Sequence, residues 1–156
     1  MKVVVIDDEP DVREMLRDVL EMDDHDIIDA ADGASGLEVI KAEHPDLVIC
    51  DIHMPGMTGD ELFERLQKSE PELKIIPFIF LSGLATKSEQ IKRLNGGANN
   101  CFEKPVDLKL FAAHVNAVLS GVSRTSAYIN TQLDAIYSSL PDSVDRHFKE
   151  YHSLCD

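Results

Sequence analysis

The segment that decides the fold is Asp46-Leu-Val-Ile-Cys-Asp51-Ile-His-Met-Pro-Gly-Met-Thr-Gly59. Its residues 47–50 are four consecutive apolar residues, a pattern typical of a strand buried on both faces of a parallel sheet. The prolines and glycines that follow indicate a loop, and Thr58 and Glu61 have the spacing of a capping box, which predicts a helix directly afterwards. Asp51 therefore stands at the carboxyl end of a buried strand, where open α/β sheets place their ligands.

Similar apolar segments alternate with amphipathic ones along residues 1 to 120. Strands are expected over 3–6, 27–30, 47–50 and 75–81 and around 101–102, and helices over 10–20, 37–44, 59–70, 87–95 and 108–119. Five strands that alternate with five helices predict an α/β fold with a parallel sheet covered on both faces. Pro71 is expected to end the third helix. In the fourth, Ile91 and Leu94 are the only large apolar residues, so we expect a thin core face and a loosely held helix.

Composition indicates an ordinary globular chain of 156 residues, 44% apolar and 28% charged. Because the net charge is −14, non-specific binding to nucleic acid is not expected. No apolar segment approaches the length of a membrane span, and the N-terminus lacks the pattern of a secretory signal, so a cytoplasmic location is expected. The three cysteines and six histidines show no spacing typical of a zinc site.

Polar residues follow four of the five expected strands. Asp7 and Asp8 come after the first strand, Asp51 after the third, Ser82 after the fourth and Lys104 after the fifth. Because the carboxyl ends of parallel strands meet at one edge of a sheet, these residues are expected to gather there. Taken singly, each has a simpler interpretation: a helix N-cap, a turn, a strand-end hydroxyl or a solvated charge. Their joint position favours a functional site.

The chemistry of this residue set indicates phosphoryl transfer. Converging carboxylates require a cation, and oxygen ligands favour Mg²⁺, Ca²⁺ or Mn²⁺. Mg²⁺ keeps several waters and leaves one carboxylate free to react, while Lys104 supplies a point charge for phosphate and Ser82 a hydroxyl. We therefore predict a phosphoryl-binding pocket in which Asp51 is the nucleophile and forms an acyl phosphate.

Together these segments resemble the receiver domain of two-component response regulators, in register over residues 1 to 120. The matching segments are Val4-Val-Ile-Asp-Asp-Glu-Pro10, the segment quoted first, Phe80-Leu-Ser-Gly83 and Gly97-Ala-Asn-Asn-Cys-Phe-Glu-Lys-Pro105. The resemblance implies a flavodoxin-like sheet of strand order 2-1-3-4-5 with the site at its switch point. It also implies a signalling module that catalyses only its own phosphorylation and dephosphorylation.

The resemblance assigns roles to individual residues. Asp51 would be phosphorylated by a histidine kinase or phosphotransfer protein, and Asp8, Asp51 and the backbone carbonyl of His53 would bind Mg²⁺, with Asp7 acting through water. Ser82 and Lys104 would contact the phosphoryl oxygens. The Lys104–Pro105 bond would be cis, and phosphorylation would rearrange the 87–95 helix and the fifth strand.

The sequence departs from the family pattern at one switch position. The family usually has Tyr or Phe three residues before the lysine, where this chain has Cys101, and Phe102 would face the opposite side of the sheet. We therefore expect output to be read from the 87–95 helix or from the C-terminal segment. His53 is either a residue that tunes dephosphorylation or a solvent-facing loop histidine.

Residues 121–156 are not part of a receiver domain. They are expected to form two amphipathic helices, with a break at Pro141, that make a helical extension. The extension would pack on the receiver, on a second copy of itself or on a target protein. The chain could also be a fragment of a larger regulator whose DNA-binding or enzymatic effector domain is missing. A rival interpretation, a phosphatase of the haloacid dehalogenase kind, requires an aspartate where this chain has His53.

Overall fold

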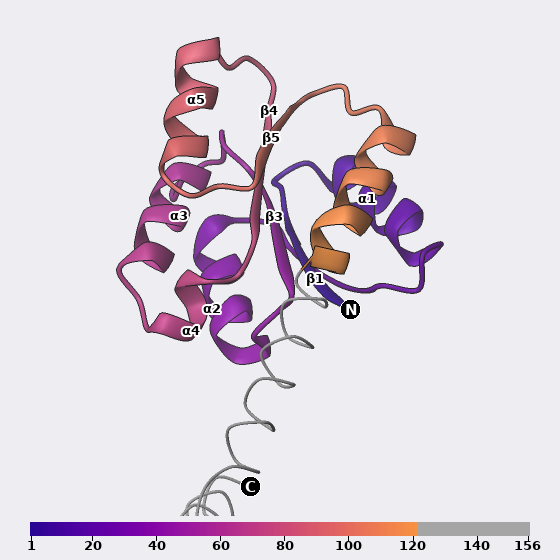
Figure 1. Ribbon diagram of the computed structural model, residues 1–156, viewed down its shortest axis with the longest axis horizontal. Coiled ribbons are helices and arrows are strands. Elements are labelled where there is room, and N and C mark those ends of the chain that lie inside the picture. The colour runs from indigo at the N-terminus through magenta and orange to yellow at the C-terminus, as the bar shows by residue number, and fades with distance from the viewer. Residues whose placement is uncertain (122–156) are drawn as a thin grey trace, which may run out of the picture. The chain divides into compact units, whose positions relative to one another are not determined.

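A computed structural model describes residues 1–121 and shows a five-stranded parallel sheet of order β2-β1-β3-β4-β5 (Figure 1). The strands are β1 (Lys2–Ile6), β2 (Asp26–Ala30), β3 (Leu47–Asp51), β4 (Phe78–Ser82) and β5 (Asn100–Glu103). The predicted α/β class, the flavodoxin-like architecture and the strand order are therefore confirmed. In β3 and β4 every residue is buried, as expected of central strands covered on both faces.

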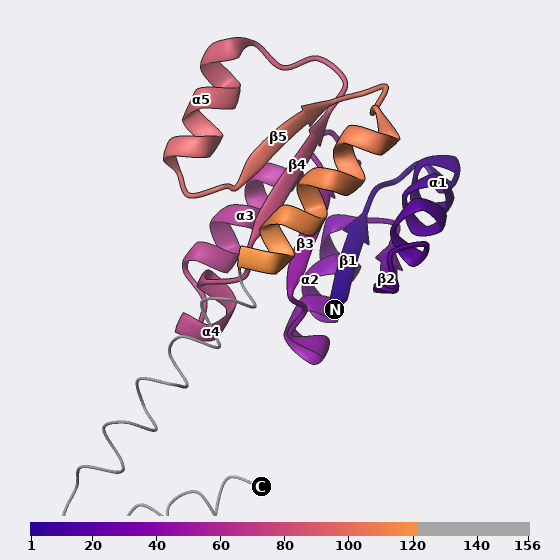
Figure 2. The same cartoon turned by 45° about the vertical axis from the view of Figure 1, so that its right-hand side comes forward.

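Helices cover both faces of the sheet (Figure 2). They are α1 (Pro10–Glu21), α2 (Gly33–Glu43), α3 (Gly59–Gln67), α4 (Pro71–Lys74), α5 (Lys87–Asn95) and a helix over residues 108–121, orange in the figures. One apolar core joins α1 and the 108–121 helix to one face of the sheet, and a second joins α2, α3 and α4 to the other. Alternate strand residues supply the two cores, Val3 and Val5 one and Val4 and Ile6 the other.

Local sequence signals set several helix ends. Pro10 begins α1, where the missing N–H of proline costs no hydrogen bond. Thr58 and Glu61 form the predicted capping box at the start of α3. Thr86 and Glu89 form a second capping box, at the start of α5. These caps place the two helices directly after the loops that follow β3 and β4.

Proline accounts for two of the predicted boundaries that are wrong. α3 ends at Gln67, and Pro71 begins the short helix α4 instead of ending α3, because proline fits the first turn of a helix. Strand β4 begins at Phe78 and not at Ile75, because Pro77 has no N–H to donate to a neighbouring strand. Ile75 instead is the C-cap residue that follows α4, and it is 80% exposed.

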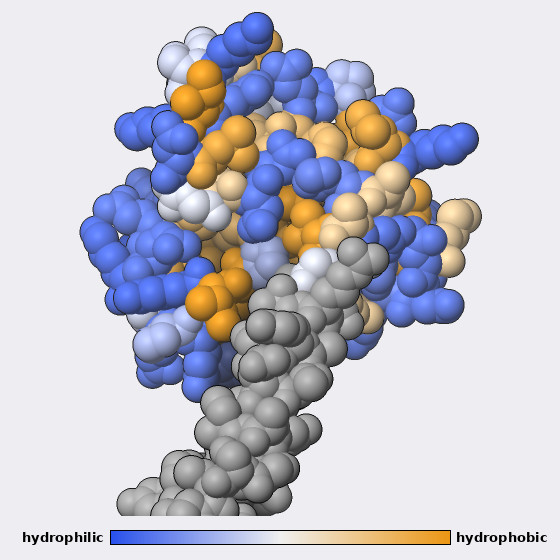
Figure 3. Space-filling view, viewed as in Figure 1, coloured by the Kyte–Doolittle hydropathy of each residue, from blue (hydrophilic) through white to orange (hydrophobic). Residues whose placement is uncertain are grey.

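Helix α5 has the predicted bounds, but its apolar residues do not form a core face. Ile91 and Leu94 are 55% and 42% exposed, and no residue of α5 is buried. Figure 3 shows hydrophobic atoms at the surface of this helix among hydrophilic neighbours. Its attachment to the sheet must therefore come from contacts other than apolar burial.

The predicted helical extension falls outside the described residues, apart from Gly121. Its arrangement as a helix hairpin stays a prediction. Within residues 1–121, no helix is both long and apolar enough to span a bilayer.

Candidate functional site

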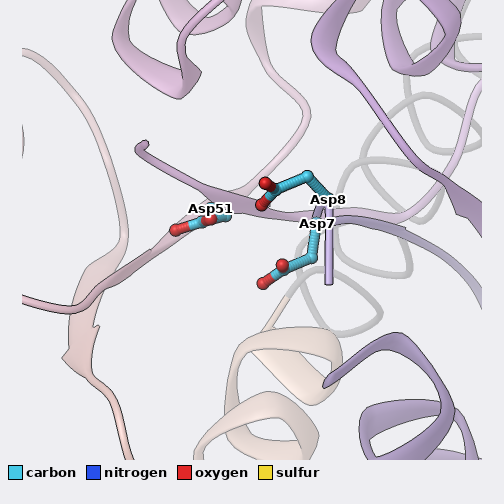
Figure 4. Close-up of side chains that lie close together, drawn as sticks. All are labelled: Asp7, Asp8 and Asp51. Atoms are coloured by element: carbon cyan, nitrogen blue, oxygen red, sulfur yellow. The ribbon is translucent and has the colours of Figure 1, made fainter. Parts of the chain in front are cut away.

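The candidate site lies at the carboxyl edge of the sheet, where four strands end. Asp7 and Asp8 directly follow β1, Asp51 and Ser82 are the last residues of β3 and β4, and Lys104 follows β5. Figure 4 shows that Asp7 and Asp8 extend their carboxylates toward the side of β3 on which Asp51 stands. The parallel topology thus brings together side chains that are up to 97 residues apart in the sequence.

Three carboxylates form a compact cluster. One oxygen from each of Asp7, Asp8 and Asp51 lies within 4.8 Å of the others. Asp7 is fully buried and Asp51 is 4% exposed, while Asp8 faces solvent. Negative charges at this separation repel one another, more strongly where water is excluded. The donor set, carboxylates only, fits a hard divalent cation such as Mg²⁺.

Lys104 is the cation that the chain itself supplies to the cluster. Its Nζ atom lies 2.8 Å from Asp7 Oδ2, 3.4 Å from Asp51 Oδ2 and 3.2 Å from Glu9 Oε1. Burial disfavours the charged form of Lys104. Hydrogen bonding and attraction to Asp7, with smaller contributions from Asp51 and Glu9, outweigh burial and raise the pKa of Lys104 above its usual value. The side chain therefore stays protonated at neutral pH.

The backbone holds Lys104 in place at the end of β5. Its N–H donates to the carbonyl of Ser82 at 2.8 Å, and the peptide bond to Pro105 is cis. The ammonium group thus belongs to the same rigid sheet edge as the carboxylates.

The Asp51 carboxyl has a raised pKa. Burial is the main cause, and repulsion from Asp7 adds to it, while Lys104 partly offsets both. Ionised Asp51 is therefore destabilised in the folded protein, and a cation bound at this site would relieve the destabilisation.

Ser82 carries a hydroxyl that lacks a partner. Its side chain is fully buried, and its Oγ atom has no hydrogen-bond partner among residues 1–121. Buried hydroxyls are nearly always hydrogen-bonded, so an unpaired one next to a carboxylate cluster fits a site that binds an oxygen-rich ligand. Ser82 stands one residue beyond Leu81, which pairs with Asp51 in the sheet register.

Two supporting residues escaped the sequence prediction. Glu9 binds Lys104, and Arg13 of α1 donates from Nη1 to the carbonyl of Asp7 at 2.6 Å while its Nε lies 3.1 Å from Asp29 Oδ2. Arg13 thereby fixes the backbone that carries the acidic pair. The one feature of the sequence that could have indicated this role of Arg13 is its position on the first turns of α1, four residues after Glu9.

Two further predicted residues contribute no side chain to the carboxylate cluster. His53 lies exposed on the loop after β3, and its role as a carbonyl ligand stays a prediction. Cys101 lies on β5 beside Phe80, on the α3 side of the sheet. Phe102 faces the opposite side, as predicted, with its ring centroid 5.2 Å from that of Phe111.

Comparisons with known proteins agree on one family. The chain matches the model of the response regulator receiver domain over residues 3–116. It is 36% identical over 129 residues to the probable transcriptional regulator ycf27 of Porphyridium aerugineum, a match that covers 83% of this chain and 52% of that protein. It is 31% identical to protein PilH of Pseudomonas aeruginosa, over 77% of this chain and 98% of that one.

A solved structure supports the same assignment. The signal receiver domain of a signal transduction histidine kinase from Syntrophus aciditrophicus superposes with a TM-score of 0.71 and 31% identity, over 79% of this chain and 92% of that one. The chain spans about half the length of the ycf27 relatives that it matches.

Proposed function

The chain belongs to the response regulator receiver domain family of two-component signalling, and we propose that it is a switch in which Asp51 accepts a phosphoryl group with the help of Mg²⁺. The donor would be a histidine kinase or phosphotransfer protein in the cytoplasm. One observation carries the proposal: a single ammonium group, Lys104 Nζ, bridges Asp7 and Asp51 at 2.8 and 3.4 Å within a cluster of three carboxylates. That arrangement matches what phosphoryl transfer requires, which is positioning and neutralisation of charge.

The transfer step follows from the positions of these residues. A carboxylate oxygen of Asp51 attacks the phosphorus of a phosphohistidine, the P–N bond breaks, and the imidazole leaves with the electron pair. An acyl phosphate forms on Asp51. Lys104 moves its charge from Asp51 Oδ2 to a phosphoryl oxygen, and the unpaired Ser82 hydroxyl donates to another.

The carboxylate cluster supports a role for Mg²⁺ in the proposed transfer. Asp8, Asp51 and the backbone carbonyl of His53 would hold Mg²⁺, with Asp7 acting through a bound water, and the ion neutralises phosphoryl charge when bound. The buried Asp7 carboxylate is already paired with Lys104, which favours an indirect role for it. The chain would have no further enzymatic activity beyond gaining and losing its own phosphoryl group.

Phosphorylation would switch the surface formed by α5 and β5. The new phosphoryl oxygens give Ser82 a partner and draw the end of β4 inward, and the loop from β4 leads directly into α5. Output would run through protein–protein contact, either by α5, β5 and the 108–121 helix or by the 121–156 extension. No nucleic-acid or membrane contact is proposed for this chain.

The test is incubation of the full chain with acetyl phosphate and Mg²⁺, followed by intact mass measurement. We expect one added phosphoryl group on the wild type and none on Asp51→Asn. Uptake should require Mg²⁺ and should fall at least tenfold in Asp8→Asn, because the metal loses a carboxylate.

Asp11→Asn is the matched control, since Asp11 lies on the first turn of α1 and outside the carboxylate cluster. It should take up phosphate like the wild type. Retention of the added mass in Asp51→Asn would refute the proposal, as would the absence of any uptake by the wild type.

A further inference from the structure

Helix α5 is attached to the rest of the protein in an unusual way. It has no buried residue, and its two large apolar side chains, Ile91 and Leu94, are mostly exposed. A surface helix normally docks through an apolar stripe, and α5 does not. A hydrogen bond of 3.2 Å from Gln90 to the exposed Glu103 is a weak attachment.

The strong contact of α5 is an ion pair made by Arg93. Its Nε and Nη2 atoms each lie 2.8 Å from one oxygen of Asp60 in a bidentate arrangement. Its guanidinium carbon lies 5.6 Å from the centroid of the Phe80 ring. The Arg93 side chain is only 11% exposed, whereas that of Asp60 is 49% exposed, so solvent reaches the carboxylate but little of the guanidinium.

Asp60 connects this ion pair to the phosphoacceptor. It is the second residue of α3, next to Gly59, whose backbone packs against the carbonyl of Asp51 so closely that a Cβ there would lie 2.3 Å from the oxygen. The N–H of Gly59 also donates to Ile52 at 2.9 Å. The start of α3 therefore cannot shift without moving the end of β3, and Arg93 holds that start.

Because the Cys101 side chain is small, the Arg93 side chain has space beside Phe80. Cys101 pairs with Phe80 in the sheet register, and both side chains lie on the α3 side of the sheet. The Arg93 guanidinium lies over the Phe80 ring, beside which Cys101 stands. Burial raises the pKa of the Cys101 thiol, and the positive charge of Arg93 opposes that rise. A small side chain here lets the guanidinium reach over the Phe80 ring.

We propose that the Arg93–Asp60 ion pair is a clasp that holds α5 in place and ties its position to the segment that carries Asp51. Apolar burial does not hold this helix, so the clasp controls how readily it is released. The role of α5 as the element that moves on phosphorylation rests on the proposed function. The clasp is tested separately, on the unphosphorylated chain.

The test is hydrogen exchange, followed by mass spectrometry, on the full chain. In Arg93→Ala the amides of α5 should exchange roughly tenfold faster than in the wild type, while those of β1 and β3 stay protected and show that the variant is folded. Asp60→Asn should give the same acceleration. The double variant should add little to either single change, because both remove one interaction.

Lys92→Ala is the matched control, since it removes the same charge from the neighbouring residue, which forms no ion pair with the described residues. It should leave exchange in α5 unchanged. Equal exchange in Arg93→Ala and the wild type would overturn the clasp, and so would additive effects of the two single changes. Neither result depends on phosphate uptake, so failure of Asp51 to become phosphorylated would be a distinct outcome.

Discussion

The backbone of Gly59 packs directly against the carbonyl oxygen of Asp51, and a Cβ atom built on Gly59 would lie only 2.3 Å from that oxygen. The first turn of α3 and the last residue of β3 are therefore one rigid unit. This contact explains why the first residue of α3 is a glycine, because there is no space for a Cβ atom at this position.

Gly59→Ala should destabilise the protein and slow phosphorylation together. The new methyl group must push α3 away from β3, at a cost of about 1–3 kcal/mol in the free energy of unfolding, measured by urea denaturation. Gly83→Ala is the matched control, because a Cβ at Gly83 meets no atom within 4 Å. Equal stability of the two variants would contradict the packing argument.

Asp51→Asn should stabilise the protein at neutral pH in the absence of Mg²⁺. Burial, and then repulsion from Asp7, raise the pKa of Asp51, so its ionised form is less favourable in the folded state than in the unfolded state. The neutral amide removes that penalty, with a gain of about 1 kcal/mol, the usual size of a single-site effect. Thermal unfolding in buffer containing a chelator measures the gain.

The same shift predicts how the gain depends on pH. The folded state retains the Asp51 proton to higher pH than the unfolded state, in which the pKa of Asp is about 3.9. As the pH rises from about 3.9 through the higher pKa of Asp51 in the folded state, the contribution of Asp51 to the free energy of unfolding of the wild type therefore falls. Asp51→Asn has no carboxyl group at this position and does not show this fall. The two proteins should converge near pH 3 and diverge above it. A constant difference across this range would contradict the assignment.

Mg²⁺ should raise the stability of the wild type by binding the folded carboxylate cluster. At a concentration 100 times the dissociation constant, linkage gives about 2.7 kcal/mol. Asp8→Asn should lose most of this increment, because Asp8 is the carboxylate of the cluster that faces solvent. Asp11→Asn should keep it. A Mg²⁺ effect that is the same in both variants would point to non-specific binding to this acidic chain, whose net charge is −14.

The fold and the edge of the sheet that carries the candidate site could be predicted from the sequence. The fold depends on the periodicity of apolar residues, and the position of the site depends on where the strands end. Runs such as 47–50 have no alternation, so they identify buried parallel strands, and residues that follow such strands meet at one edge. By that logic one edge of the sheet is expected to carry five polar residues, Asp7, Asp8, Asp51, Ser82 and Lys104. The wrong end of α3 arose because proline signals a helix start as readily as a helix end. The wrong start of β4 arose because Pro77 has no N–H to donate within a sheet.

Contacts between side chains far apart in the sequence were beyond prediction. Nothing in the pattern around Arg93 indicates that it reaches Asp60, which lies 33 residues earlier. Helical periodicity instead pointed to Ile91 and Leu94 as the attachment of α5, and both are exposed. Apolar spacing identifies a face of a helix, but not whether the protein turns that face inward.

Cys101→Tyr should loosen α5, because the larger ring competes with Arg93 for the space beside Phe80. Displacement of the guanidinium weakens its ion pair with Asp60, so exchange of the α5 amides should accelerate several-fold, toward the rate in Arg93→Ala. Cys101→Val is the size control, since it keeps a small apolar group on the same face and should leave exchange unchanged. The idea would be contradicted if the α5 amides exchanged at the wild-type rate in Cys101→Tyr but faster in Arg93→Ala. Residue 101 and Arg93 would then not compete for the space beside Phe80, and the absence of an aromatic residue at position 101 would not affect the clasp.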